Sequence, residues 1–263
     1  MTDAPILVNE EIVNGKTLVT VILNRPQQLN AVDGSLLHKL CEIINGLSRN
    51  PNIGALLIKS NNASSFCTGI DVKYVNSLSN EQSARFFEKL SCLLQRIIDF
   101  PYPTVASIDG YAFGAGADIA LACDIRIGNR DATFRFPGPQ FGLLLGTQRL
   151  IQEVGPSKAR YLTLTNSKLD ATQALQYGLL HEVDQNESAF IGAYSYAKMV
   201  TGITNYTFSM IDNLCSEDRS GKRCPIALAK QSVEHDDFKM RFLHYLSEVR
   251  VMKKGGTSNE TPS

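Results

Sequence analysis

Two short glycine turns carry the residue types that could do chemistry in this chain. The first is SFCTGIDVK at residues 65–73, and the second is GYAFGAGAD at residues 110–118. Each follows an apolar run with strand character and leads toward a predicted helix. Glycine frees the backbone at such a turn, and unpaired N–H groups at a helix start attract negative charge. Two converging turns would offer a pair of N–H donors to an oxygen atom that takes up charge during a reaction.

Asp118 adds a carboxylate to the second turn. A positioned carboxylate can move a proton, so the stretch predicts acid–base chemistry beside an anion-stabilising site. A structural alternative fits this stretch alone equally well. Gly114 and Gly116 would let a helix pack closely on a strand, and Asp118 would be a first-turn acid stabilised by the helix dipole. The glycine spacing matches neither GxGxxG nor a P-loop, which disfavours nucleotide binding.

The elements that must position these turns alternate between strands and helices. Runs rich in Val, Ile and Leu predict buried strands at residues 17–24, 53–60, 103–109 and 123–129. Amphipathic stretches lie at 34–47 and 81–100, and the second has helical spacing with a Ser79–Gln82 capping box. The next helix is predicted to begin near Ala115. This order predicts an α/β fold of strand–strand–helix units.

Beyond about residue 145 the pattern is mostly helical. A capped helix is predicted from Asp170 through Gln176, with a stop at Gly178 and a short strand after it. The last dozen residues lack apolar content and are expected to form a frayed tail.

Composition excludes several classes of protein. A chain of 263 residues with 43% hydrophobic residues can bury a full core. Lys+Arg and Asp+Glu number 26 each, so no bulk charge favours nucleic acid or an anionic membrane. The six cysteines form no CxxC pair and the four histidines have no zinc spacing, which indicates reduced thiols and no metal site. Without a membrane span or signal peptide, we expect a cytoplasmic protein with a small-molecule or protein partner.

Five motifs in order resemble the crotonase superfamily, the enoyl-CoA hydratase and isomerase proteins. They are LNRPQQLNAV (23–32), SFCTGIDVK (65–73), PTVASIDGYAFGAGADIALACDIRI (103–127), GTQRL (146–150) and LDATQALQYGLLHEV (169–183). The resemblance implies a right-handed spiral of ββα units over residues 1–200. It also implies a helical module at 201–252 that assembles trimers or dimers of trimers, and we expect a disordered tail at 253–263.

The resemblance implies that the substrate is an acyl-CoA thioester, with coenzyme A as part of the substrate and no separate cofactor. It puts the two oxyanion donors on the backbone N–H groups of Thr68 and Ala115, and the catalytic acid on Asp118. The residues implied in substrate and CoA binding are Gln28, Ala31, Thr68, Gly69, Ile70, Asp71, Gly114 and Ala115.

The sequence departs from the hydratase pattern at the second acid. Family hydratases use two glutamates, and the matching positions here are Asp118 and Gly138. The stretch between Pro137 and GTQRL is also about three residues shorter. A single carboxylate can still move a proton between carbons, which is the chemistry of double-bond isomerisation. The segment 203–223 has no counterpart of that length in ordinary relatives.

Three functions stay open from the sequence. The first is an isomerase or hydratase type enzyme on acyl-CoA thioesters with one carboxylate. The second is a non-catalytic acyl-CoA binding or assembly protein, which the missing acid favours. The third is decarboxylation or thioester hydrolysis, in which the oxyanion site does most of the work.

Overall fold

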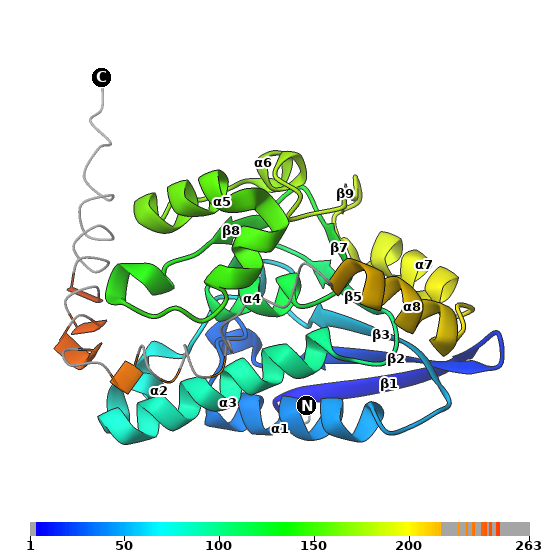
Figure 1. Cartoon of the computed structure of the whole chain (residues 1–263), viewed down its shortest axis with the longest axis horizontal. Coiled ribbons are helices and arrows are strands. Elements are labelled where there is room, and N and C mark those ends of the chain that lie inside the picture. Colours follow the sequence, from blue (N-terminus) through cyan, green and yellow to red (C-terminus); the bar gives the residue numbers. More distant parts are fainter. Residues whose placement is uncertain are drawn as a thin grey trace.

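The computed structural model describes residues 4–216, 226, 230, 233–234, 238–240, 242–243 and 246–247. The strands in Figure 1 are β1 (Ile6–Val13), β2 (Lys16–Leu23), β3 (Ile53–Ser60), β4 (Ser65–Cys67), β5 (Thr104–Ile108), β6 (Tyr111–Phe113), β7 (Ile125–Gly128), β8 (Thr133–Arg135) and β9 (Glu182–Val183). The helices are α1 (Gly34–Leu47), α2 (Val72–Ser77), α3 (Asn80–Ile98), α4 (Ala115–Leu121), α5 (Thr147–Thr165), α6 (Ala171–Gln176), α7 (Phe190–Val200) and α8 (Asn205–Ser216). Short 3-10 turns lie at Pro26–Gln28 and Gly138–Phe141.

From β3 onward, successive strands alternate between two sheets. The large sheet has the order β1-β2-β3-β5-β7-β9, and the small sheet has the order β4-β6-β8. Within them β3, β5 and β7 pair in parallel, as do β4, β6 and β8. The pairs β3–β4, β5–β6 and β7–β8 therefore each give one strand to each sheet before a helix follows. The predicted α/β fold of ββα units is confirmed.

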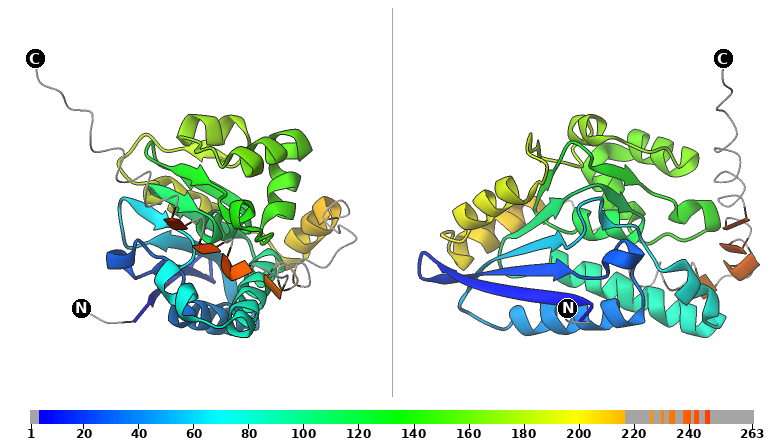
Figure 2. Two further views of the ribbon diagram at one scale, coloured as in Figure 1. Left: turned by 90° about the vertical axis from the view of Figure 1, so that its left-hand side faces the viewer. Right: turned by 180° about the vertical axis from the view of Figure 1, so that it is seen from behind.

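The large sheet is covered by helices on both faces. Leu56 and Ile58 of β3 belong to the core cluster that includes α1 and α3, whereas Ala55 and Leu57 pack with Ala193 of α7. Figures 1 and 2 show α7 on the other side of the sheet from α1 and α3. Burial on both faces explains why the parallel strands are nearly continuous apolar runs.

The helix caps predicted from the sequence are present. Ser79 Oγ accepts from the Gln82 amide at 3.2 Å, and Gln82 Oε1 accepts from the Ser79 amide at 2.8 Å. Asp170 and Gln173 form a second capping box at the start of α6. The antiparallel strand β1 and the small sheet were not predicted. Within the described ranges, no helix combines the length and apolar character needed to cross a bilayer.

The predicted domain boundaries stay predictions. Only part of the predicted oligomerisation module, 201–252, is described, and α8 occupies much of the unusual 203–223 segment. The predicted tail, 253–263, lies outside the described residues.

Candidate active site

The two glycine turns lie against each other in the fold. Gly69 has a φ of +98° and Gly114 a φ of +49°, values that side chains rarely allow. A Cβ atom on Gly69 would lie 3.0 Å from the Phe113 carbonyl oxygen and 3.7 Å from the Ala115 nitrogen. The turn after β4 therefore approaches the turn after β6 as closely as backbone atoms permit.

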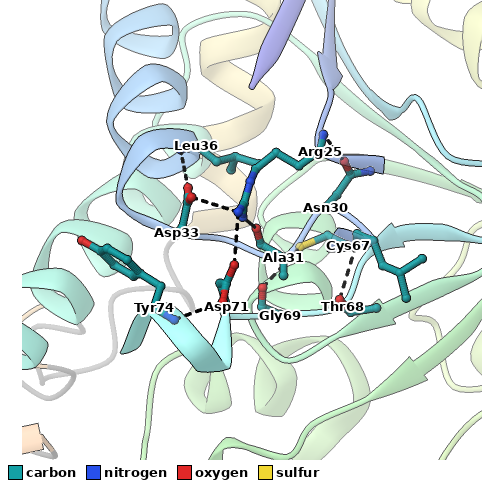
Figure 3. A network of polar contacts seen from close by, with 11 residues as sticks. Arg25, Asn30, Ala31, Asp33, Leu36, Cys67, Thr68, Gly69, Asp71 and Tyr74 are labelled. Atoms are coloured by element: carbon teal, nitrogen blue, oxygen red, sulfur yellow. Dashed lines mark hydrogen bonds and ion pairs between the residues drawn. The ribbon is translucent and has the colours of Figure 1, made fainter. Parts of the chain in front are cut away.

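The prediction that Thr68 supplies the first donor is wrong. Its amide already donates to the carbonyl oxygen of Leu29 at 3.2 Å, and its hydroxyl donates to the same oxygen at 3.3 Å. Leu29 has a φ of +49° and Asn30 a φ of +55°, and this left-handed pair forms part of the loop that brings the carbonyl onto Thr68. Figure 3 shows Thr68 beside this loop.

Ile70 takes the place of Thr68 as the first candidate donor. The Val32 amide donates to Gly69 O at 2.7 Å, and the Asp71 amide donates to Val32 O at 2.8 Å. In this parallel bridge the amide of Ile70 itself faces away from Val32. Among the described residues, the amides of Ile70 and Ala115 have no hydrogen-bond acceptor. Both residues line the same pocket.

That pocket has a volume of about 110 Å³ and lies where the turns meet α5. Six predicted site residues line it: Thr68, Gly69, Ile70, Gly114, Ala115 and Asp118. Three do not: Gln28 is exposed, the Ala31 carbonyl accepts from Arg25, and Asp71 pairs with Arg25. Gly138 also lines the pocket, and within the described ranges its wall holds one titratable side chain, Asp118.

Asp118 is held in an environment that opposes its charge. The side chain lies in the first turn of α4 and the residue is 6% exposed. Burial raises the pKa of its carboxyl group to about 7, against an opposing effect of the Arg149 charge. A carboxyl group with a pKa near neutrality can both accept and release a proton. This property suits a group that must do both in one reaction.

The carboxylate rests against Gly146, the residue that caps α5. A Cβ atom at Gly146 would lie 1.6 Å from Oδ1 of Asp118, so no larger residue fits there without displacing the acid. The motif GTQRL contains this glycine, and nothing in its local sequence predicts a contact with Asp118. Only the packing of α5 on α4 brings the two together.

Arg149 is the cation that offsets the burial of Asp118. It is 7% exposed, and its Nε and Nη2 atoms have no hydrogen-bond partner among the described residues. Burial lowers the pKa of its guanidinium, whereas the charges of Asp118 and Asp99 raise it. Arg149 belongs to the GTQRL motif, and its position in the sequence does not predict that it lies near Asp118.

A second arginine, Arg25, ties together the loops that frame the first turn (Figure 3). Its Nη2 atom lies 3.0 Å from Asp33 Oδ2 and 3.1 Å from Asp71 Oδ2, and its Nη1 atom donates to the Ala31 carbonyl. Asp33 caps α1 and Asp71 caps α2 through their other oxygens. Arg25 therefore fixes the residues on either side of Val32, which pairs with Ile70, and the residue directly after Ile70.

We expect Arg25→Met to lower the free energy of unfolding by about 1–3 kcal/mol, because two largely buried carboxylates lose a charged donor. The side chains of Arg25, Asp33 and Asp71 are only 16–18% exposed. Urea unfolding measures the change. The matched control is Arg85→Met, whose ion pair with Glu81 is 60% and 76% exposed and should contribute less than about 0.5 kcal/mol. Equal losses in both variants would show that the ion pairs of Arg25 stabilise the fold no more than an exposed ion pair does.

Two further acids near the motifs have structural partners. Glu153 pairs with the buried Arg126 at 2.6 Å, and Asp124 accepts from the amide and hydroxyl of Thr104 at 2.8 Å each. Across the described residues, no group of three or more His, Cys, Asp or Glu side chains could hold a metal ion.

Curated relatives match a large part of the chain. The mitochondrial enoyl-CoA hydratase domain-containing protein 2 of Mus musculus is 35% identical over 174 residues, covering 65% of this chain and 59% of the relative. Human mitochondrial methylglutaconyl-CoA hydratase is 30% identical, covering 65% and 51%. The crotonyl-CoA hydratase of Syntrophomonas wolfei is 32% identical, covering 65% and 66%. The chain thus spans about six tenths of the mouse relative's length.

Solved structures and a family model also show similarity to enoyl-CoA hydratase and isomerase proteins. A candidate enoyl-CoA hydratase/isomerase from Bordetella parapertussis superposes with a TM-score of 0.82 at 25% identity, covering 93% of this chain and 99% of that one. An enoyl-CoA hydratase from Bacillus anthracis, at 22% identity and a TM-score of 0.77, shares the fold over 95% of this chain and 96% of its own. The enoyl-CoA hydratase/isomerase family model matches residues 14–220. The chain belongs to the enoyl-CoA hydratase/isomerase family.

Proposed function

We propose that this protein shifts a carbon–carbon double bond in acyl-CoA thioesters, with one carboxylate as the proton carrier. The observation that carries the proposal is that one pocket combines a buried acid with two amides that have no hydrogen-bond acceptor in the described part of the chain. The amides of Ile70 and Ala115 are the proposed donors to the thioester oxygen. Asp118 is the proposed acid and base.

The chemistry balances with these groups alone. In ionised form, Asp118 takes a proton from a carbon of the unsaturated acyl chain, and the electron pair delocalises onto the thioester oxygen. Two backbone donors stabilise that enolate, an effect usually worth about 10²–10³ in rate per donor. Asp118 then returns the proton to a different carbon, and the double bond moves. No water is consumed, so a second acid is not required.

A non-catalytic acyl-CoA binding protein is the second candidate. The glycine at position 138 favours it, because family hydratases carry a glutamate at the matching position and the pocket wall described here holds one acid only. This alternative keeps the same pocket and the same ligand class. It differs in predicting no turnover.

A panel of CoA esters tests the proposal. We expect 3-enoyl-CoA and 2-enoyl-CoA esters to interconvert, detected by ultraviolet absorbance of the conjugated thioester, with little hydration product. Acetoacetyl-CoA should raise Tm, because a ligand that binds the folded state stabilises it. If Tm rises while every enoyl ester stays unchanged, the binding protein is correct and the isomerase is not.

Other expectations remain predictions. They are assembly as a trimer or dimer of trimers, the lack of any cofactor beyond the substrate's coenzyme A, and cytoplasmic location. The mouse and human relatives are named as mitochondrial proteins, so their names do not support the cytoplasm.

A further inference from the structure

The pocket wall includes a packed group of phenylalanine rings. Phe141 and Phe242 line the pocket with ring centroids 5.3 Å apart. Phe238 backs both of them, at 6.3 Å from Phe141 and 5.8 Å from Phe242, and it contacts Phe87 of α3 at 5.7 Å. All four rings are 5% exposed or less. Close packing of this kind leaves the wall little room to yield to a longer ligand.

The volume of the pocket also limits the size of the acyl group that it can hold. It measures about 110 Å³. A dry apolar cavity of about 150 Å³ holds one benzene molecule, which has six carbon atoms. By the same measure this pocket holds about four non-hydrogen atoms. An acyl group of about four carbons would fill it.

The charge on the pocket wall limits which charge the acyl group can carry. Among the described residues, Asp118 is the only charged side chain that lines the pocket, and no Lys, Arg or His does. The Arg149 guanidinium affects Asp118 electrostatically but is not part of the wall. A substrate that carries its own carboxylate would place a second anion near Asp118, with no cation among the described wall residues to receive it. Such like-charge contacts are strongly unfavourable.

We propose that this pocket selects short, uncharged acyl groups and rejects both long chains and dicarboxylic acyl groups. This selectivity rests on the proposed function, since it concerns the acyl part of the same thioester. It argues against decarboxylation of a malonyl-type ester at this site, because that reaction needs a substrate carboxylate in the pocket. It also distinguishes this pocket from one that would accept a glutaconyl-type acid.

Binding of saturated esters tests the selectivity without turnover. Calorimetry would compare free CoA, butyryl-CoA, succinyl-CoA and octanoyl-CoA. We expect butyryl-CoA to bind most tightly and succinyl-CoA at least about tenfold more weakly. Octanoyl-CoA should bind no more tightly than butyryl-CoA, although burying its four additional methylenes would strengthen binding about 200-fold.

Variants test the limit on chain length and the limit on substrate charge separately. Phe242→Ala should let octanoyl-CoA bind at least about tenfold more tightly by opening the wall. Phe242→Leu, which keeps the site apolar, should give a smaller gain in the same direction. Thr147→Lys puts a cation on the wall from the first turn of α5, and it should narrow the difference between succinyl-CoA and butyryl-CoA. The neutral control Thr147→Met should leave that difference unchanged.

Two results would separate the possible failures. Wild-type protein that binds succinyl-CoA or octanoyl-CoA more tightly than butyryl-CoA overturns the selectivity and leaves the proposed function intact. Protein that binds butyryl-CoA no more tightly than free CoA overturns the proposed function itself.

Discussion

Asp118→Asn is expected to reduce turnover of enoyl-CoA esters by about 10²–10⁴-fold, the usual loss when a general acid or base is removed. Asparagine keeps the size of the side chain, so the affinity for a saturated ester should stay unchanged. In wild-type protein, activity should rise with pH through about 7, because burial raises the pKa of Asp118 to that value and the ionised form is the base. Steady-state kinetics from pH 5 to pH 9 measures both effects. Full activity in the variant would exclude Asp118 as the proton carrier.

The same substitution should change how stability depends on pH. The folded protein keeps the Asp118 proton up to about pH 7, whereas the unfolded chain loses it near 3.8. Stability should therefore fall as pH rises between these values, by up to about 4 kcal/mol, and then level off. Asp118→Asn should lack this fall.

A comparison with the variant is necessary because His181 acts in the opposite direction. Burial and the charge of Arg126 lower its pKa to about 4, so the unfolded chain binds a proton there that the folded chain does not. Its contribution to stability rises with pH up to about 6.5. Urea unfolding of both proteins at pH 5 and pH 8 isolates Asp118 from this background. Identical pH dependences would contradict the burial of an ionisable acid at 118.

Gly146→Ala is expected to reduce turnover by about 10²-fold or more, because the added Cβ displaces the Asp118 carboxylate, and a misplacement of about 1 Å already costs that much. The added Cβ would lie 1.6 Å from Oδ1 of Asp118, and one of the two must move. The backbone itself tolerates alanine, since Gly146 has a φ of −105° and a ψ of 6°. The loss should appear in kcat, with smaller effects on binding of a saturated ester.

Gly46→Ala is the matched control. This glycine lies near the end of α1, and a Cβ atom there would meet nothing within 4 Å. Its alanine variant should keep full activity and gain about 0.5–1 kcal/mol of stability from helix propensity. If Gly146→Ala retained wild-type kcat, Asp118 would not need the position in which the structure holds it.

The large sheet could be predicted from the sequence because its strands are long and buried on both faces. The run at 53–60 matches β3 at both ends. The small sheet could not be predicted in this way, since β4, β6 and β8 have three residues each. A three-residue strand is too short to show a period, and its pairing is decided by neighbours distant in sequence.

The part of the site that depends on local sequence could be predicted, whereas the part that depends on contacts between distant segments could not. Glycine at 69 and 114 and the acid at 118 are local signals, and the structure brings all three into one pocket. The choice between the amides of Thr68 and Ile70 depends on the Leu29 carbonyl, which arrives from a different loop. Gly146 and Arg149 were missed because only the docking of α5 places them beside Asp118.

The alternation of strands between two sheets has a geometric consequence for the amides of Ile70 and Ala115. They follow β4 and β6, which are parallel neighbours, so they occupy equivalent places in two successive ββα units. The distance between the two amides is therefore set by the spacing of the neighbouring strands β4 and β6. Extra residues in the connection that carries α2 and α3 would leave it unchanged. A slip of one residue between β4 and β6 would instead carry one amide about 3.3 Å along its strand, and the pair would no longer share an oxygen.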